Sequence, residues 1–299
     1  MKVGVIGSTG LVGSRLIELL QNSYTFAEFN RSEGTDITNL DSLKTVADDT
    51  EIEWVILLAA KADVDGCEQD KAFGESSDAW KINVEGAKNV ADICHKTGKK
   101  IIYISTDFVF DGTKPEEEQY SEQDMTNPLN WYGYTKLRGE QAVQASGAHH
   151  VIVRLAYPYR SYFEKKKDFV RAIKSRLETV QPVMGVTDHL FTPTFIDDFV
   201  IAIHTLLSQN VQGIYHVTGN DVLTPYEATQ LIAQEFDLDS TLISSTTRDE
   251  YFAGKAQRPF NLSLNNDKIK ALGVRMRTFQ EGLKEMQHQI ANLNASHQE

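Results

Sequence analysis

The sequence has few cysteines, few prolines and no long hydrophobic run. Its 299 residues include only two cysteines, Cys67 and Cys94, and seven prolines. Two thiols cannot build a disulfide framework or a four-ligand zinc site, so we expect both to be free and buried. The longest apolar run of note, 54–60, is far shorter than the roughly 20 residues that span a bilayer. The N-terminus is interrupted by glycines and lacks the pattern of a signal peptide, so a cytoplasmic protein is expected.

Positive charge is scarce relative to negative charge. Lysine and arginine total 30 against 42 aspartates and glutamates, which gives a formal net charge of −12. Because a chain this acidic repels polyanions, we expect neither a nucleic acid partner nor, in the absence of an apolar span, a membrane partner. The hydrophobic fraction of 41% is enough for an ordered core. The short charge runs at 116–118 and 165–167 are interpreted as solvated surface.

Short apolar runs alternate with helix-period patterns over the first two thirds of the chain. The run at 54–59 is apolar without alternation, as expected for a strand buried on both faces. This alternation indicates an α/β fold with a doubly wound parallel sheet. Strands are predicted at 2–6, 25–30, 54–59, 101–105 and 151–154, with helices at 11–20, 82–98 and 131–145. Later helices are predicted at 169–178, 196–207, 225–236, 267–272 and 279–293, and short strands at 181–183, 214–217 and 242–244.

The length is consistent with two parts at roughly 150 residues per domain. We expect residues 1–156 to form a nucleotide-binding domain that also carries the catalytic residues. Residues 157–299 are expected to form a smaller mixed α/β lobe that binds the substrate and returns some segments to the main sheet.

A glycine-rich turn joins the first predicted strand to the first predicted helix. It contains Gly7, Thr9, Gly10 and Gly13, followed along the helix start by Leu11 and Val12. Glycines at these places permit a tight turn, a close approach of a pyrophosphate and close helix–strand packing. The free N–H groups of the helix N-terminus then bind the phosphates. This arrangement is typical of the Rossmann fold, and its GxxGxxG spacing is typical of extended short-chain dehydrogenase/reductases.

The end of the second strand decides between the two nicotinamide dinucleotides. An acidic residue there would bind the ribose hydroxyls of NAD, whereas this chain has Asn30 and Arg31. Because a guanidinium suits a 2′-phosphate, NADP(H) is favoured over NAD(H). Asp36 and Ile37 match an acidic–apolar pair that such enzymes place beside the adenine.

A Tyr-x-x-x-Lys pair, Tyr132 and Lys136, begins the helix at 131–145. One helical turn places both side chains on one face, where the ammonium group can lower the pKa of the phenol for use as a general acid. Thr106 and Ser105 end the preceding strand, where the ligand crevice of a doubly wound sheet lies, so Thr106 is expected to bind a carbonyl oxygen.

Two further Tyr-x-x-x-Lys pairs show that this spacing alone carries little information. Tyr162/Lys166 and Tyr251/Lys255 lie in the later part of the chain, with no hydroxyl-bearing strand end before them. We therefore interpret both as surface or packing residues.

Five stretches of this sequence resemble the dTDP-4-dehydrorhamnose reductase family of extended short-chain dehydrogenase/reductases. They are GSTGLVG at 7–13, VDGCEQ at 64–69, STDFVFDG at 105–112, NPLNWYGYTKLRGE at 127–140 and RPFNLSL at 258–264. The regulatory β subunit of methionine adenosyltransferase shares similar motifs. The third and fourth stretches are the most specific to this group.

The resemblance implies a role for each matching residue. Thr106, Tyr132 and Lys136 would be catalytic. The cofactor would contact Gly7, Thr9, Gly10, Leu11, Val12, Gly13, Asn30, Arg31, Asp36, Ile37, Ala59, Ala60, Lys61, Ser105, Tyr132 and Lys136. A sugar nucleotide would contact Val64, Asp65, Thr106, Asp107, Phe108, Tyr157 and Arg258, with Arg258 suited to its diphosphate.

Several pocket positions depart from the family pattern. Phe108 stands where a tyrosine is usual, Ala62 where a threonine is frequent, and Tyr157 where a tryptophan is common. The stretch 191–194 differs from a usual Gly-x-Pro-Thr. Because hydrogen-bonding pockets discriminate strongly, the reaction class is better supported than the identity of the sugar.

These residues favour NADPH-dependent reduction of a 4-keto-6-deoxy sugar nucleotide, with hydride delivered to C4 and Tyr132 as the proton donor. A sugar-nucleotide epimerase using NAD and a non-catalytic NADP(H)-binding regulatory subunit stay open. A dehydratase would require a glutamate where Phe108 follows Asp107. No metal site is predicted, because the histidines show no ligand spacing. A homodimer also stays open.

Overall fold

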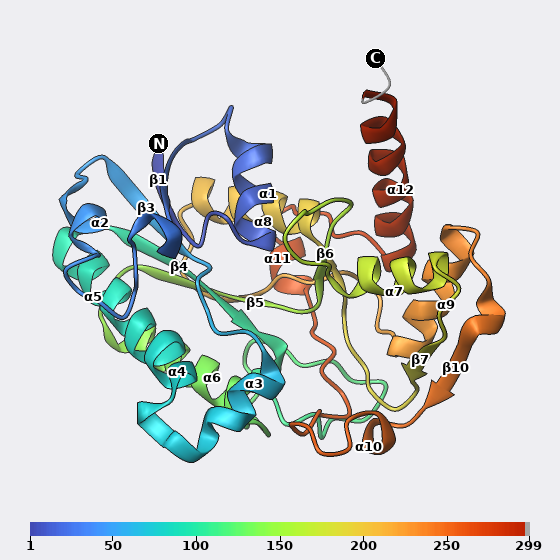
Figure 1. Cartoon of the computed structure of the whole chain (residues 1–299). Coiled ribbons are helices and arrows are strands. Elements are labelled where there is room, and N and C mark those ends of the chain that lie inside the picture. Colours follow the sequence, from blue (N-terminus) through green and yellow to red (C-terminus); the bar gives the residue numbers. More distant parts are fainter. Residues whose placement is uncertain (297–299) are drawn as a thin grey trace.

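A computed structural model describes residues 1–296 of the chain (Figure 1). Its centre is a six-stranded sheet in the order β2-β1-β3-β4-β5-β9, and every neighbouring pair is parallel. The doubly wound α/β fold predicted from the strand–helix alternation is therefore confirmed. The strands are β1 (Lys2–Ile6), β2 (Thr25–Phe29), β3 (Ile52–Leu57), β4 (Lys100–Thr106), β5 (His150–Leu155) and β9 (Gly213–His216).

Helices cover both faces of this sheet (Figure 1). One face packs against α1 (Leu11–Leu20) and α8 (Ile196–Ser208). The other packs against α2 (Lys44–Asp48), α5 (Ala87–Thr97) and α6 (Trp131–Ala145).

Strand β4 contributes side chains to the hydrophobic cores on both faces of the sheet. Ile102 and Ile104 face the layer of α1 and α8, whereas Ile101 and Tyr103 face that of α5 and α6. Successive side chains of a strand point to opposite faces, so an uninterrupted apolar run buries both.

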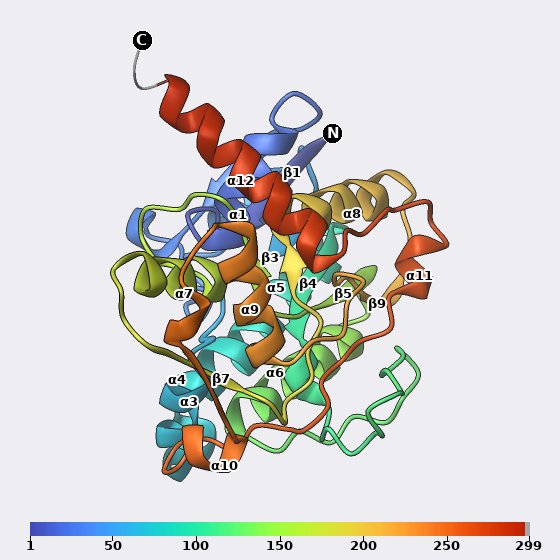
Figure 2. The same ribbon diagram turned by 90° about the vertical axis from the view of Figure 1, so that its right-hand side faces the viewer.

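The later part of the chain builds a smaller mixed lobe and also completes the main layer. Helix α8, strand β9 and the short α11 (Asp267–Lys270) belong to the main layer. An aromatic core of Tyr159, Phe191, Phe195 and Phe279 holds the lobe. The lobe contains β6 (Pro158–Tyr159) paired with β8 (Thr194–Phe195), β7 (Val183–Val186) paired with β10 (Ile243–Thr246), α7 (Phe169–Glu178), α9 (Pro225–Glu235), α10 (Arg248–Tyr251) and α12 (Phe279–Ser296). Figure 2 shows α12 projecting from the body of the molecule.

Most predicted elements lie within two residues of their predicted bounds, and the exceptions are local. The strand predicted at 181–183 lies at 183–186, and the helix predicted at 279–293 continues to Ser296. The predicted helix at 82–98 begins earlier, with a short α4 (Asp78–Trp80), and passes through a π-helical segment, η3 (Lys81–Gly86). It ends at Gly98 in the left-handed conformation, as predicted.

Several short elements escaped prediction. These are α2, α10, β6, β8, α3 (Val64–Asp70) and the 3-10 turns η1 (Arg31–Glu33), η2 (Lys71–Ser76), η4 (Asp107–Val109) and η5 (Ser240–Leu242). Elements of two to seven residues contain too few positions for a periodic pattern. Over residues 1–296, no helix is both long and apolar enough to cross a membrane.

Candidate active site

The glycine-rich turn makes a phosphate cradle at the carboxyl end of β1. Gly7 has φ +94°, and a Cβ there would lie 2.9 Å from the backbone nitrogen of Ala59. A Cβ on Gly13 would lie 2.5 Å from the carbonyl oxygen of Gly7, so helix and strand pack too closely for a side chain. Gly10 caps α1 without a side-chain hydrogen bond, and the first turn of α1 contains no acidic residue. The N-terminal N–H groups of α1 are therefore available to an anion.

A cavity of about 660 Å³ extends from this turn along the carboxyl ends of β3, β4 and β5. This is the position at which open α/β sheets bind ligands. The cavity brings together most of the predicted cofactor, catalytic and substrate residues. It is lined by Gly7, Gly10, Leu11, Val12, Gly13, Leu58, Ala60, Ala62, Val64, Ile104, Ser105, Thr106, Asp107, Phe108, Tyr132, Lys136, Leu155, Tyr157, Pro158, Lys166, Lys167, Asp168, Phe169, Phe252 and Arg258.

Polar groups at the end of β4 are buried without partners. The hydroxyl of Ser105 and one carboxylate oxygen of Asp107, Oδ2, make no hydrogen bond. The other oxygen, Oδ1, accepts a hydrogen bond of 2.8 Å from the Thr106 hydroxyl. Burial raises the pKa of Asp107 to about 7. Unpaired buried polar atoms that line a cavity fit a ligand with hydrogen-bonding groups of its own.

Tyr132 lies in the first turn of α6, held there by the helix cap. The side chain of Asn130 accepts from the N–H of Gly133 at 2.9 Å and donates to the carbonyl of Gln257 at 2.9 Å. Gly133 is required because a Cβ would lie 2.1 Å from the carbonyl oxygen of Phe108. Tyr132 and Phe108 then meet edge to face, with ring centroids 5.7 Å apart.

Lys136 lies one turn further along α6 and is buried. Its Nζ donates a hydrogen bond of 2.7 Å to the carbonyl of Ile104 and lies 4.0 Å from the centre of the Tyr103 ring. Burial lowers the pKa of Lys136 to about 7, and the nearby carboxylate of Glu140 opposes this effect.

The expected lowering of the Tyr132 pKa is wrong for this structure. Burial raises the pKa of Tyr132 well above its usual value, and a hydrogen bond with Thr106 opposes the rise only in part. The ammonium group of Lys136 is directed at the Ile104 carbonyl, so its charge does not dominate the phenol.

Arg258 lines the cavity and is held by Asp65. Their side chains are 2.8 Å apart, and the guanidinium also donates to the carbonyl of Ala256 at 2.7 Å. Asp65 is not itself a lining residue, and its carboxylate fixes the position of Arg258. Its expected contact with a sugar nucleotide stays a prediction.

Tyr157 lines the same cavity as Tyr132 and Lys136, and its backbone is strained, with φ +41°. Its hydroxyl is 3.1 Å from Nε2 of His189, whose Nδ1 is 2.8 Å from the carbonyl oxygen of Pro259. Burial lowers the pKa of His189 to about 4, so the ring is neutral near pH 7. Since a carbonyl can only accept, Nδ1 carries the proton and Tyr157 donates to Nε2. Sequence reasoning missed His189 because it lies 32 residues away from Tyr157.

The predicted determinants of cofactor choice lie outside this cavity, after β2. The guanidinium of Arg31 is 81% exposed and lies 3.3 Å from the carboxylate of Asp36. The buried side chain of Asn30 caps η1, and Ile37 is buried beneath Gly86. Arg31 is thus accessible, whereas Asn30 and Ile37 have structural contacts.

Thr9, Ala59 and Lys61 also lie outside the cavity lining. Lys61 forms an ion pair with Asp70, and its backbone is held by the side chain of Asn83, which accepts at 2.9 Å and donates at 3.0 Å. The Asn83 amide also donates to the Thr135 hydroxyl at 3.0 Å. Asn83 lies in the π-helical segment and joins the loop after β3 to α6; no sequence motif marks it.

The interpretation of 165–167 as solvated surface is incomplete, because Lys166 and Lys167 line the cavity. Tyr162 is 58% exposed and is not a lining residue. Tyr251 is 39% exposed and stacks beneath the Lys255 ammonium at 5.2 Å. Among the three Tyr-x-x-x-Lys pairs, only that of Tyr132 contributes both side chains to the cavity. No group of three or more His, Cys, Asp or Glu side chains in the described part of the chain is placed to hold a metal ion.

Known proteins share this sequence and fold over almost the whole chain. The β subunit of methionine adenosyltransferase 2 from Rattus norvegicus is 30% identical, covering 95% of this chain and 86% of the relative. The dTDP-4-dehydrorhamnose reductase of Sinorhizobium fredii is 27% identical, covering 96% of each. A crystal structure of dTDP-4-dehydrorhamnose reductase from Bacillus anthracis in complex with NADP superposes with a TM-score of 0.87 at 28% identity, covering 96% of this chain and 99% of that chain. The family described as RmlD substrate binding domain matches residues 1–292, and the chain belongs to this family.

Proposed function

We propose that this protein reduces the 4-keto group of a 4-keto-6-deoxy sugar nucleotide with NADPH. The observation that carries the proposal is the convergence of Thr106, Tyr132 and Lys136 on one cavity that begins at the glycine turn. The crystal structure of a similar reductase in complex with NADP supports the cofactor class.

Each catalytic side chain has a role that follows from its position. NADPH, when bound, supplies the hydride. Thr106 and Tyr132 can both donate to the keto oxygen, which gathers negative charge as the carbonyl is reduced. Tyr132 then gives its proton to the forming alkoxide, which is the stronger base even though burial raises the pKa of the phenol. Proton transfer leaves a negative charge on the Tyr132 oxygen, which Lys136 in its ammonium form stabilises.

The opposite wall supports a substrate that has both a sugar and a diphosphate. The Arg258 guanidinium at the rim offers a bidentate contact to a diphosphate. Tyr157 and Phe108 offer aromatic surface to the sugar, close to the unpaired oxygen of Asp107. At the far end, Arg31 is accessible to a 2′-phosphate because an exposed ion pair such as that with Asp36 is worth about 0–1 kcal/mol. We therefore propose a preference for NADP(H).

The test is oxidation of NADPH, followed by absorbance, with a dTDP-4-keto-6-deoxy sugar as substrate. Wild-type protein is expected to turn over, and Tyr132→Phe is expected to bind NADPH normally while losing about 10²–10⁴-fold in kcat. The matched control is Tyr251→Phe, which changes the exposed member of another Tyr-x-x-x-Lys pair. Absence of turnover in the wild type, despite NADPH binding, would contradict the proposal.

A second function is favoured by one observation. The relatives named as the β subunit of methionine adenosyltransferase 2 are 28–30% identical to this chain and cover 94–95% of it. In this alternative the protein holds NADP(H) and regulates a methionine adenosyltransferase. Co-purification with that enzyme, together with no reductase activity on any keto sugar nucleotide, would favour it.

A further inference from the structure

The loop of residues 160–168, which we name the lysine loop, joins β6 to α7 and lies beside the start of α1 (Figure 1). The Nζ of Lys165 lies 3.4 Å from the carbonyl oxygen of Thr9. Lys166 and Lys167 line the same cavity as Gly10 and Gly13. Two segments 150 residues apart in the sequence therefore face one another across the entrance to the phosphate cradle.

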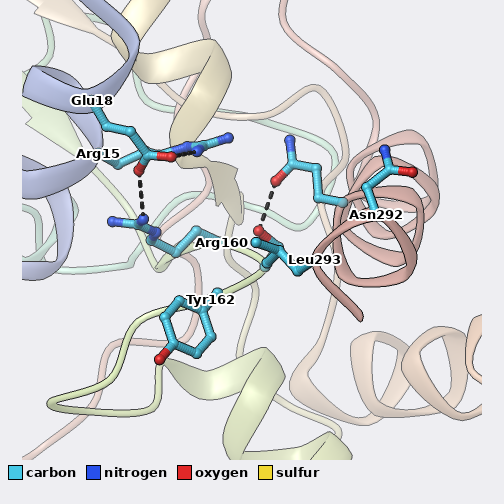
Figure 3. A pocket seen from close by; sticks show the side chains of 8 residues that line it. Arg15, Glu18, Arg160, Tyr162, Asn292 and Leu293 are labelled. Carbon is cyan, nitrogen blue, oxygen red and sulfur yellow. Dashed lines mark hydrogen bonds and ion pairs between the residues drawn. The ribbon is translucent and has the colours of Figure 1, made fainter. Parts of the chain in front are cut away.

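The start of the lysine loop is fixed to helix α1 by Arg160. This buried guanidinium donates to the carbonyl of Leu11 at 3.2 Å, the hydroxyl of Ser14 at 3.0 Å and the carboxylate of Glu18 at 3.0 Å. Figure 3 shows Arg160 directed at Glu18, with Tyr162 of the lysine loop below. Because Leu11 begins α1, the lysine loop is tied to the helix that forms the cradle.

The end of the lysine loop is shaped by Arg171, in the first turn of α7. Its guanidinium donates to the carbonyls of Phe163 and Lys166, each at 2.6 Å, and to the Asp168 carboxylate at 2.7 Å. Asp168 also caps α7 and accepts from the N–H of Arg160 at 3.3 Å. These bonds hold the backbone around Lys166 although it belongs to no helix or strand.

The charges around the cavity entrance leave one cation without a partner. The negative charge of Asp168 is compensated by the guanidinium of Arg171. The ammonium group of Lys167 donates to the Ser175 hydroxyl at 2.5 Å. The Lys166 side chain has no hydrogen bond or ion pair with the described residues. Glu164 is the only other acid in the lysine loop, so the run 165–167 outweighs it. This positive cluster stands out in a chain of net charge −12 and lies where an anion would enter the cradle.

We infer that the lysine loop is the second half of the cofactor phosphate site, with Lys166 binding the pyrophosphate that α1 receives on its N–H groups. The inference rests on the proposed function, since the pyrophosphate is that of a nicotinamide dinucleotide. The two halves are complementary. Helix α1 offers neutral N–H donors, and the lysine loop adds the full positive charge that the glycine turn lacks.

The test is a set of equilibrium titrations with NADPH, NADH, adenosine 2′-monophosphate and dTDP, monitored by calorimetry. NADH has the pyrophosphate but no 2′-phosphate, and adenosine 2′-monophosphate has the 2′-phosphate but no phosphate at the 5′ position. Lys166→Ala is expected to weaken NADPH and NADH alike by about 3- to 10-fold, and to leave adenosine 2′-monophosphate and dTDP unchanged. Lys166→Glu is expected to weaken both dinucleotides further, by more than about 10-fold. The matched control, Lys96→Ala, removes an exposed lysine at the end of α5, away from the cavity, and should change nothing.

The other outcomes overturn the inference in distinguishable ways. Unchanged binding of NADPH to both Lys166 variants would remove Lys166 from the site while leaving the proposed function intact. Loss confined to NADPH and adenosine 2′-monophosphate would assign Lys166 to the 2′-phosphate instead. Loss of dTDP binding alone would assign it to the sugar nucleotide. If the wild type failed to bind any dinucleotide, the proposed function and this inference would both fall.

Discussion

The two ends of the candidate site differ in how far their polar groups are removed from water. At the proposed catalytic end, Tyr132, Lys136 and Asp107 are buried, and burial shifts the pKa of each of them. At the proposed phosphate end, Lys166 in the cavity and Arg31 outside it are exposed. Electrostatic effects grow as the local dielectric constant falls, so a single charge matters far more at the buried end. We therefore expect changes of charge at β4 and α6 to have large effects, and changes of charge at the phosphate end to have small ones.

The largest effect is expected from Lys136→Met at the buried end. Removing this charge beside Tyr132 should lower kcat by about 10²–10⁴-fold in the NADPH oxidation assay. The matched control is Lys255→Met, in a Tyr-x-x-x-Lys pair outside the cavity, which should keep kcat within about twofold. Similar losses in both variants would show that the buried position of Lys136 has no special role.

The same substitution should leave the protein folded or make it more stable. The Lys136 pKa is near 7 in the folded protein against 10.5 as a free side chain, so the unfolded state binds more protons between these values. Wild-type stability therefore rises with pH from about 7 to 10.5, and Lys136→Met should lose this rise. Urea unfolding of both proteins across this pH range tests it; equal slopes would contradict it.

Next in size is the cost of breaking a buried ion pair behind the catalytic helix. Arg154 makes two hydrogen bonds to Glu140, at 3.0 and 2.8 Å, with both side chains at most 3% exposed. Glu140→Ala leaves the guanidinium buried without its partner and should cost about 3–5 kcal/mol in the free energy of unfolding.

The exposed pair Lys88–Asp92 is the comparison for that measurement. Asp92→Ala should cost about 0.5 kcal/mol or less, because i,i+4 surface pairs are weak. Denaturant unfolding measures the loss of stability in both variants. Equal losses in the free energy of unfolding would contradict the expected difference between buried and exposed ion pairs.

A smaller effect is expected from the titration of Asp107. Its pKa near 7 means that the group is neutral below this pH and charged above it. A negative charge in the sugar site should repel a diphosphate substrate, so kcat/KM should fall as pH rises through about 7, by up to roughly tenfold. Asp107→Asn should remove this decrease from the pH profile of kcat/KM. If the decrease is unchanged in the variant, it must be assigned to Lys136 instead.

The smallest effect is expected at the exposed phosphate end. Arg31→Ala should weaken NADPH by about 3- to 10-fold and leave NADH within about twofold, since only NADPH has a 2′-phosphate. Calorimetric titration of both cofactors measures this ratio, and Lys96→Ala again serves as the control for loss of an exposed charge. Equal weakening of NADPH and NADH binding would show that Arg31 does not determine the choice between the two cofactors.

Local patterns were sufficient for much of the fold. Helix α6 has the predicted bounds because Asn130 provides a cap at its start, and α7 likewise follows its cap Asp168. The glycine turn was also predictable, since a strand, three glycines and a helix lie within 20 residues. The pairing of β6 with β8 was not, because two-residue strands carry no period of their own.

The candidate site likewise has features that the sequence could predict and features that it could not. The Thr106–Tyr132–Lys136 cluster could be predicted because strand ends and following helices meet at one edge of a parallel sheet. The raised pKa of Tyr132 could not, because burial depends on groups from β4, α6 and the later lobe together. The contact between Asp65 and Arg258 could not be predicted either, because the two residues are 193 positions apart and only the packed chain brings them together.

The sequence by itself determined the alternating strands and helices, the glycine cradle and the spacing of Tyr132 and Lys136, because each depends on residues within a few turns of one another. Tertiary structure decided which charges are buried and which meet across the cavity. It brought Lys166 to the glycine turn, His189 to Tyr157 and Asp65 to Arg258. Such contacts join segments from different elements, and the desolvation that sets their strength exists only once the chain is packed.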